Sequence, residues 1–332
     1  MLTVLLSTRD RAAILQKTLE SFCCLQRPSS GWKLVVVDNG STDGTSAVLA
    51  SFANRLPLHM VSDPAAGKNA ALNAGLAFVE GDLTVLTDDD IFPRADWLIE
   101  LRNAADTQPG YSMFGGSIVP RWEIPPPAWI EWVEKGPMYG LTDSSMKEGE
   151  IRPLLVFGGN MAVRSALFQS GIRFDTSVGP RSSSYRMGSE TELTLRLNRQ
   201  GHKAWYVPGA VVEHFIRDYQ MREPWVLQRA IRYGRGCFRL WHAETWEPVT
   251  TFGIPRYYLR QMNLVRQILQ EELKVLTARL GSDHRQFFSA RWQRNFLWGV
   301  VTEAHLWHRL PGSEQDKPLP GNSEVGAATS KL

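Results

Sequence analysis

Leu83-Thr84-Val85-Leu86-Thr87-Asp88-Asp89-Asp90 is the stretch of this sequence that decides its fold. An apolar run that ends abruptly in carboxylates is typical of a buried strand whose carboxyl end opens into a polar crevice. Residues 33–38, Lys-Leu-Val-Val-Val-Asp, have the same form, and the apolar run Leu2–Leu6 is followed by Ser7-Thr8-Arg9-Asp10. Parallel strands present their carboxyl ends at one edge of a sheet, so these three polar endings are predicted to converge.

Segments with apolar residues at helical spacing separate these runs. They are residues 11–22, 45–52 and 69–79, and a short strand is expected at 58–61. Strands that alternate with helices predict an α/β fold with a mostly parallel, Rossmann-like sheet flanked by helices.

The rest of the chain is expected to contain further strands, mostly before residue 216, and then mainly helices. Strands are expected at 112–119, 154–157 and 203–207, and helices at 190–199 and near 221–241, 255–280 and 284–309. We therefore expect an α/β unit over 1–216, with halves 1–110 and 111–216, and a helical C-terminal region over 217–310. The polar tail 311–332, rich in Pro, Gly and Ser, is expected to be disordered.

The composition excludes several classes of protein. With 332 residues, 43% hydrophobic and 21% charged, the chain is not a disordered, collagen-like or disulfide-scaffold protein. A formal net charge of +3 is too small to indicate a nucleic-acid partner, and none is expected. The three cysteines lack metal-site spacing, and there is neither a signal peptide nor an apolar run of about 18 residues. We expect a cytoplasmic protein.

The three successive aspartates, Asp88-Asp89-Asp90, indicate a cation site. Adjacent carboxylates repel one another unless solvent or a cation compensates their charge. Carboxylate oxygens with open positions suit Mg²⁺ or Mn²⁺ shared with substrate phosphates. A solvated acidic turn is the alternative.

The ordered set of motifs over roughly residues 1–216 resembles the family 2 glycosyltransferases, which have the GT-A fold. The motifs are Ser7–Asp10, Val35–Asp43, Gly67-Lys68 with Ala71–Gly75, Leu86–Asp90, Gly158–Arg164, Gly188–Leu193 with Arg196, and His214.

The resemblance implies a nucleotide-sugar donor, UDP-linked, bound by the half 1–110. Many family members have Ala-Arg-Asn where this chain has Ala71-Leu72-Asn73, which leaves Lys68 as the candidate to replace that arginine. The positions that match donor-binding residues are Thr8, Arg9, Asp38, Lys68, Asn73, Asp88 and Asp89.

The resemblance also implies a metal site and a general base. Asp90, with Asp88 and His214, is expected to hold Mn²⁺ or Mg²⁺, although a structural role for His214 stays open. Glu190 falls at the position of the base that takes the acceptor's proton, and Glu192 is the reserve candidate. The implied reaction is a single displacement with inversion.

The half 111–216 is expected to bind the acceptor, a glycan or a lipid-linked sugar. The candidates are Trp122 and Trp132, whose rings could stack on sugars or lie in the core, and Gly159 with Asn160.

Arginines crowd the start of the C-terminal region, where they face either phosphate groups or solvent. They are Arg217, Arg222, Arg229, Arg232, Arg235 and Arg239. The apolar run Phe296–Val301, near Arg291 and Arg294, predicts a core helix, a homodimer helix or peripheral contact with the inner face of a membrane.

Two rival functions stay open. A sugar-phosphate nucleotidyltransferase shares a similar sheet, but it is expected to have a Gly-rich phosphate loop where this chain has Ser7–Asp10. A catalytically degenerate relative would act as a binding protein.

Overall fold

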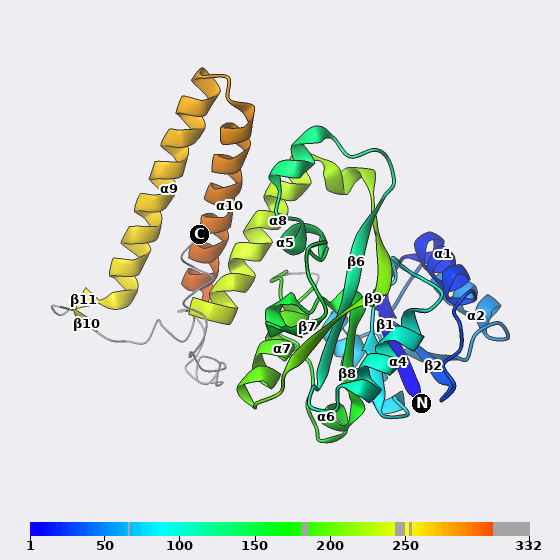
Figure 1. Cartoon of the computed structure of the whole chain (residues 1–332). Coiled ribbons are helices and arrows are strands. Elements are labelled where there is room, and N and C mark those ends of the chain that lie inside the picture. The colour runs from blue at the N-terminus through cyan, green and yellow to red at the C-terminus, as the bar shows by residue number, and fades with distance from the viewer. Residues whose placement is uncertain (66, 181–184, 243–249, 252–253, 308–332) are drawn as a thin grey trace. The chain divides into compact units, whose positions relative to one another are not determined.

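The computed structural model describes residues 1–307 except 66, 181–184, 243–249 and 252–253 (Figure 1). Residue contacts divide the chain into two units. The first comprises Met1–Pro125, Lys135–Tyr185 and Ser189–Arg217, and the second comprises Pro126–Glu134, Arg186–Gly188 and Asp218–Leu332. The expected disordered tail 311–332 lies outside the described residues.

The first unit is an α/β layer structure. Its strands are β1 (Leu2–Thr8), β2 (Trp32–Asp38), β3 (Leu58–Ser62), β4 (Leu83–Leu86), β5 (Ile91–Pro93), β6 (Met113–Trp122), β7 (Gly149–Ile151), β8 (Met161–Arg164) and β9 (Ala204–Ile216). Its helices are α1 (Ala12–Phe22), α2 (Thr45–Phe52), α3 (Lys68–Gly75), α4 (Trp97–Thr107), α5 (Lys135–Tyr139), α6 (Ser165–Gln169) and α7 (Ser189–Arg199).

The strands form one sheet in the order β3-β2-β1-β4-β8-β6-β9-β5, and β7 also pairs with β9. The side β3-β2-β1-β4 is parallel, as the alternation of strands and helices predicts, whereas β8 is antiparallel to both β4 and β6. Strands β6 and β9 run parallel to each other along the middle of the unit (Figure 1).

Burial explains why the first strands are apolar without alternation. Val4, Leu5 and Leu6 of β1 and Val35 and Val36 of β2 are all fully buried, because helices cover both faces of this side of the sheet. The result is a rigid edge from which the loops after β1, β2 and β4 extend.

One expected strand is wrong. Residues 154–157 were expected to pair, but Pro153–Leu155 forms a 3₁₀ turn, Gly158–Asn160 forms another, and the strand of this region, β8, begins at Met161. Proline has no N–H for a strand ladder and suits the first position of a helical turn, which accounts for the difference.

The second unit is helical. It contains α8 (Glu223–Cys237), α9 (Arg256–Leu280), α10 (His284–Trp307) and the short strands β10 (Thr250–Thr251) and β11 (Ile254–Pro255). Helix α10 packs against both α8 and α9. Their shared core contains Ala230, Ile268, Phe296, Leu297 and Val300, so the apolar run Phe296–Val301 belongs largely to this core.

Candidate active site

The polar ends of β1, β2 and β4 meet at one edge of the sheet. The register pairs Thr8 with Asp38, and the hydroxyl of Thr8 donates a hydrogen bond to Asp89 Oδ2 at 2.7 Å. The predicted convergence is therefore present in the structure.

Asp89 is one of the two buried members of the aspartate triplet, with Asp90. Burial and the neighbouring Asp90 raise the pKa of its carboxyl group to about 6, against the opposing effects of Arg11 and the Thr8 hydroxyl. Its carbonyl also accepts a hydrogen bond from the Thr18 hydroxyl at 2.8 Å. These contacts tie Asp89 to β1 and α1, so it anchors the loop after β4.

Asp90 lies in a positively charged environment. Its Oδ2 accepts from Arg11 at 2.9 Å and from Arg217 at 3.1 Å, and its Oδ1 lies 3.6 Å from Nε2 of His214. Burial alone would raise the pKa of Asp90, but His214 and the two arginines outweigh it and hold that pKa below its ordinary value. Asp90 is thus an ionised carboxylate at neutral pH.

His214 is brought to Asp90 by strand pairing. Ile91 in β5 pairs with His214 in β9, and Nδ1 of the imidazole lies 2.6 Å from the carbonyl oxygen of Tyr139. A carbonyl can only accept, so Nδ1 carries the proton and the lone pair of a neutral ring is on Nε2, which faces Asp90. A second hydrogen bond that fixes the ring in this way is usual for metal-binding histidines.

The pair Asp90 and His214 fits one divalent cation if the donor supplies further ligands. Nε2 and Oδ1 are close enough for one ion at about 2.1 Å from each, and Mg²⁺ and Mn²⁺ take few protein ligands when phosphates are present. Among the described residues there is no group of three or more His, Cys, Asp or Glu side chains that could hold a metal alone. Asp88 is turned away from this pair, toward Lys68.

Lys68 joins Asp88 to Glu190. Its ammonium group lies 2.6 Å from Asp88 Oδ1 and 2.7 Å from Glu190 Oε1, and it is only 21% exposed. Burial works against the charged lysine, but the two carboxylates outweigh it and raise the pKa of Lys68 well above its ordinary value. Two segments far apart in the sequence, the start of α3 and the start of α7, are thereby joined beside the aspartate triplet.

Glu190 is also confined from the other side by Gly158. A Cβ atom at residue 158 would overlap the carboxyl group of Glu190, so a glycine is required for this close approach. The carboxylate is held between Lys68 and the backbone at 158, and 20% of its side chain is exposed.

Glu192 occupies a different environment. It is 5% exposed, and both its oxygens accept from Arg196, at 2.7 and 3.0 Å. The guanidinium group of Arg196 also donates to the carbonyl of Arg173 at 2.7 Å. Glu192 therefore fastens α7 to the loop before it.

Asp38 and Arg9 are the remaining predicted residues at the edge. Asp38 accepts from the Ser41 backbone N–H and from the Ser46 hydroxyl, both at 2.9 Å, whereas Arg9 is exposed beside Asp10. Asp38 shapes the loop after β2, and Arg9 extends toward solvent.

Comparison with known proteins identifies the family. The sequence model described as "Glycosyl transferase family 2" matches residues 3–167. Residues 3–167 belong to glycosyl transferase family 2. The protein is a glycosyltransferase, and the sheet and its helices form the GT-A fold.

Two archaeal relatives cover most of the chain. Glycosyltransferase AglE of Haloferax volcanii is 24% identical over 72% of this chain and 73% of its own length. Glucosyl-dolichyl phosphate glucuronosyltransferase of the same organism is 22% identical over 68% of this chain and 72% of its own length.

Solved structures show the same fold. Mannosyltransferase PcManGT from Pyrobaculum calidifontis, in complex with GDP-Man and Mn²⁺, has a TM-score of 0.60 at 19% identity and covers 93% of this chain and 88% of its own. A structure of S. aureus TarS with UDP-GlcNAc has a TM-score of 0.51 at 13% identity, with 92% of each chain covered.

Two asparagines expected to contact ligands in this family 2 enzyme serve the fold. Asn73 exchanges two hydrogen bonds with the backbone of Phe174, at 2.8 and 2.9 Å. Asn160 is fully buried, donates to the carbonyls of Ser117 and Ala210 and accepts from the Trp97 indole. In this structure both side chains make these hydrogen bonds with the protein itself.

The other expected acceptor residues are spread over both units. Gly159 is buried beside Asp88, and its carbonyl accepts from the Thr87 hydroxyl at 2.9 Å. Trp122, in the first unit, is half-buried with its ring edge-to-face with Tyr139. Trp132, in the second unit, lies at a tilt to the ring of Phe288.

Sequence reasoning missed Arg11 and Glu303 as charged residues of importance. Arg11 directly follows the motif Ser7–Asp10, and this position was the available signal. Glu303 is fully buried in α10 and binds several arginines of the second unit, Arg186, Arg235 and Arg239. Part of the arginine cluster therefore faces an internal carboxylate, neither a ligand nor solvent.

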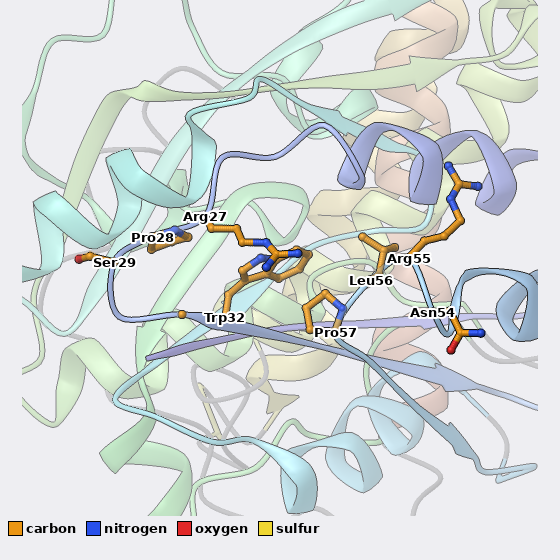
Figure 2. A pocket seen from close by; sticks show the side chains of 9 residues that line it. Arg27, Pro28, Ser29, Trp32, Asn54, Arg55, Leu56 and Pro57 are labelled. Atoms are coloured by element: carbon orange, nitrogen blue, oxygen red, sulfur yellow. The ribbon is translucent and has the colours of Figure 1, made fainter.

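A pocket of about 380 Å³ lies away from these residues (Figure 2). Its lining includes Arg27, Trp32 and Arg55, and Figure 2 shows Trp32 beside Pro57. Trp32 begins β2 and Asp38 ends it, so the pocket is at the opposite edge of the sheet from the candidate active site.

Among the described residues, no helix combines the length and the apolar character needed to cross a bilayer.

Proposed function

We propose that this enzyme is an inverting, metal-dependent hexosyltransferase that moves a sugar from a UDP-sugar to a hydroxyl group of a lipid-linked acceptor or glycan. The observation that carries the proposal is the placement of Glu190, held by Lys68 beside the aspartate triplet. A displacement reaction needs its base beside the acceptor hydroxyl, on the side of the anomeric carbon opposite the diphosphate, and a carboxylate is suited to take that proton.

The bond changes involve one proton and one sugar. Glu190 accepts the proton of the acceptor hydroxyl while that oxygen bonds to the anomeric carbon. The bond from this carbon to the diphosphate oxygen breaks, and the diphosphate leaves. Because the oxygen attacks opposite the leaving group, the product has inverted configuration.

The charges around Asp90 suit a leaving diphosphate. Arg11 and Arg217 both reach Oδ2 of Asp90, so their guanidinium groups are held at the edge where phosphates would bind. A divalent cation held by Asp90 and His214 would offset the negative charge that grows on the leaving group.

Uracil is the proposed base because the family resemblance matches Asp38 to a donor-binding position of UDP-sugar enzymes. Each oxygen of Asp38 accepts one hydrogen bond, from Ser41 and Ser46, and keeps a lone pair that can accept the N3–H of uracil. The same lone pairs could accept from guanine, so the donor panel below decides between the two bases.

A lipid-linked acceptor is supported by the relatives, since one is a glucosyl-dolichyl phosphate glucuronosyltransferase. Other relatives that match parts of the chain are named beta-monoglucosyldiacylglycerol synthase, for example in Nostoc.

The test compares two variants in one helix. We expect Glu190→Gln to lose transfer, because it removes the base, and to lower the melting temperature modestly, because it weakens the contact with Lys68. Glu192→Gln should also lower the melting temperature, because Glu192 pairs with Arg196, but it should keep most of the turnover. Transfer is measured with panels of UDP- and GDP-sugars and prenyl-phosphate acceptors with Mn²⁺, and NMR gives the product anomer.

Three results would contradict the proposal. Full activity of Glu190→Gln would exclude this base, and a retained anomeric configuration would exclude the single displacement. Turnover with GDP-sugars alone would exclude uracil.

A further inference from the structure

Helix α9 carries a row of exposed apolar side chains. Their exposed fractions run from 46% to 88%, and the residues are Met262, Val265, Leu269, Leu273, Leu276 and Leu280. Spacings of three or four residues place them along one side of an α-helix. Over 18 residues at about 1.5 Å each, the row is about 27 Å long. We call it the α9 stripe.

The opposite side of α9 is already occupied. Ile268 is buried in the core shared with α10, Leu264 packs against that core, and Glu272 accepts from Arg294 of α10 at 3.1 Å. Among the described helices of the second unit, α10 lies between α8 and α9, so α9 packs on one side only (Figure 1). The α9 stripe is therefore not part of the contact that holds α9 in the fold.

The charges beside the α9 stripe are mainly positive. Helix α9 has five basic and two acidic residues, a net charge of +3. Arg266 and Arg279 are exposed, and Lys274 is exposed but pairs with Glu271 at 2.6 Å, whereas Glu272 is engaged by Arg294 of α10. An apolar stripe flanked by cations matches a surface whose outer layer is anionic and whose interior is apolar.

We propose that the α9 stripe inserts into the interface of an anionic lipid bilayer, with α9 lying in the plane of the membrane. Amphipathic helices with basic polar faces bind such surfaces through apolar burial together with attraction to anionic headgroups. A second copy of the chain fits less well, because two facing stripes would bring the same cations together.

The proposal is independent of the transfer reaction, because lipid binding is measured without donor or acceptor. It is also compatible with that reaction, because a helix in the interface would keep the enzyme on the surface that carries a lipid-linked acceptor.

The experiment is co-sedimentation of the full chain with vesicles of phosphatidylcholine, with and without phosphatidylglycerol. We expect binding to the anionic vesicles that weakens with added salt. Leu269→Gln combined with Leu273→Gln should reduce the partition coefficient at least about tenfold, since two buried leucines are lost from the interface. The matched control is Met60→Gln, which changes a 48% exposed apolar residue of β3 and should bind as the wild type does.

Three outcomes overturn the proposal. The wild type fails to bind anionic vesicles, or the double variant binds them as well as the wild type does. Alternatively, light scattering shows a dimer that the double variant converts to monomer, which assigns the α9 stripe to a second copy. If the double variant does not fold, Arg266→Gln with Arg279→Gln replaces it, and unchanged vesicle binding by that variant also overturns the proposal.

Discussion

Substitution of Gly158 by alanine would move the proposed base without removing it. The new Cβ atom would overlap the carboxyl group of Glu190, and no main-chain atom is among its nearest contacts. Cγ and the carboxyl group of Glu190 must withdraw together by about 1 Å before the atoms reach an ordinary separation of about 3.5 Å. The fold can accept this change, whereas the contact of Glu190 with Lys68 at 2.7 Å cannot remain as it is.

The expected loss follows from the displacement. A misplacement of about 1 Å at a catalytic group costs about 100-fold in rate. That factor corresponds to about 2.7 kcal/mol of transition-state stabilisation. We therefore expect the kcat of Gly158→Ala to fall about 100-fold, while the KM for the donor changes little because the diphosphate side of the site is untouched.

The assay is the initial rate of nucleoside diphosphate release with donor and acceptor, accompanied by thermal unfolding. Gly110→Ala is the matched control, since a Cβ atom there meets nothing within 4 Å and its rate should equal that of the wild type. A wild-type kcat in Gly158→Ala would refute the assignment of Glu190. A large fall in melting temperature would show that the loss has a structural cause.

Three further predictions concern stability and binding. Glu303→Ala should cost about 3–5 kcal/mol of unfolding free energy, because it removes a fully buried carboxylate that Arg186, Arg235 and Arg239 share. Burial raises the pKa of Glu303, but its arginines outweigh this effect and hold that pKa below 4.5. The stabilisation that Glu303 gives the folded state is therefore present above pH 4.5 and lost on acidification. Denaturation at several pH values should show a flatter pH dependence of stability for Glu303→Gln. Asn73→Ala should cost about 1–3 kcal/mol in chemical denaturation while leaving the donor KM unchanged, because its two hydrogen bonds go to Phe174. UDP with Mn²⁺ should raise the melting temperature of the wild type, and His214→Ala should abolish this rise. His202→Ala is the control and should retain it, because the His202 ring lies beside the Ser112 hydroxyl, at 3.1 Å from Nδ1.

The parallel side of the sheet could be predicted because its sequence signal is local. A run such as Val35–Val37 that ends in Asp38 indicates a strand, its burial and its polar end at once. The rest of the sheet could not be read so directly. Strand β8 lies between β4 and β6 and is antiparallel to both, and four residues cannot indicate which strands they will pair with.

The features of the candidate site also divide into those that the sequence predicts and those that it does not, according to how far apart the interacting residues are in the sequence. The motifs predicted that Lys68 and Glu190 belong to the site. They did not predict the contact between the two side chains, because 122 residues separate them in the sequence. Asn73 shows the reverse problem. An asparagine in a family motif has the same sequence signal whether its amide faces a nucleotide or a backbone.

The pairing of charged side chains was the feature that could least be predicted from the sequence. Arg235 and Arg239 look like a basic helix face as long as only nearby residues are counted, and the partner that neutralises them, Glu303, lies more than sixty residues further on. The same reasoning applies to Asp90, whose partners Arg11 and Arg217 come from opposite ends of the first unit. A count of charges along the chain therefore predicts that a charged site exists, but only the fold decides which charges remain for a ligand. On this ground the exposed cations of α9 are better evidence for an anionic surface than the more crowded arginines of α8.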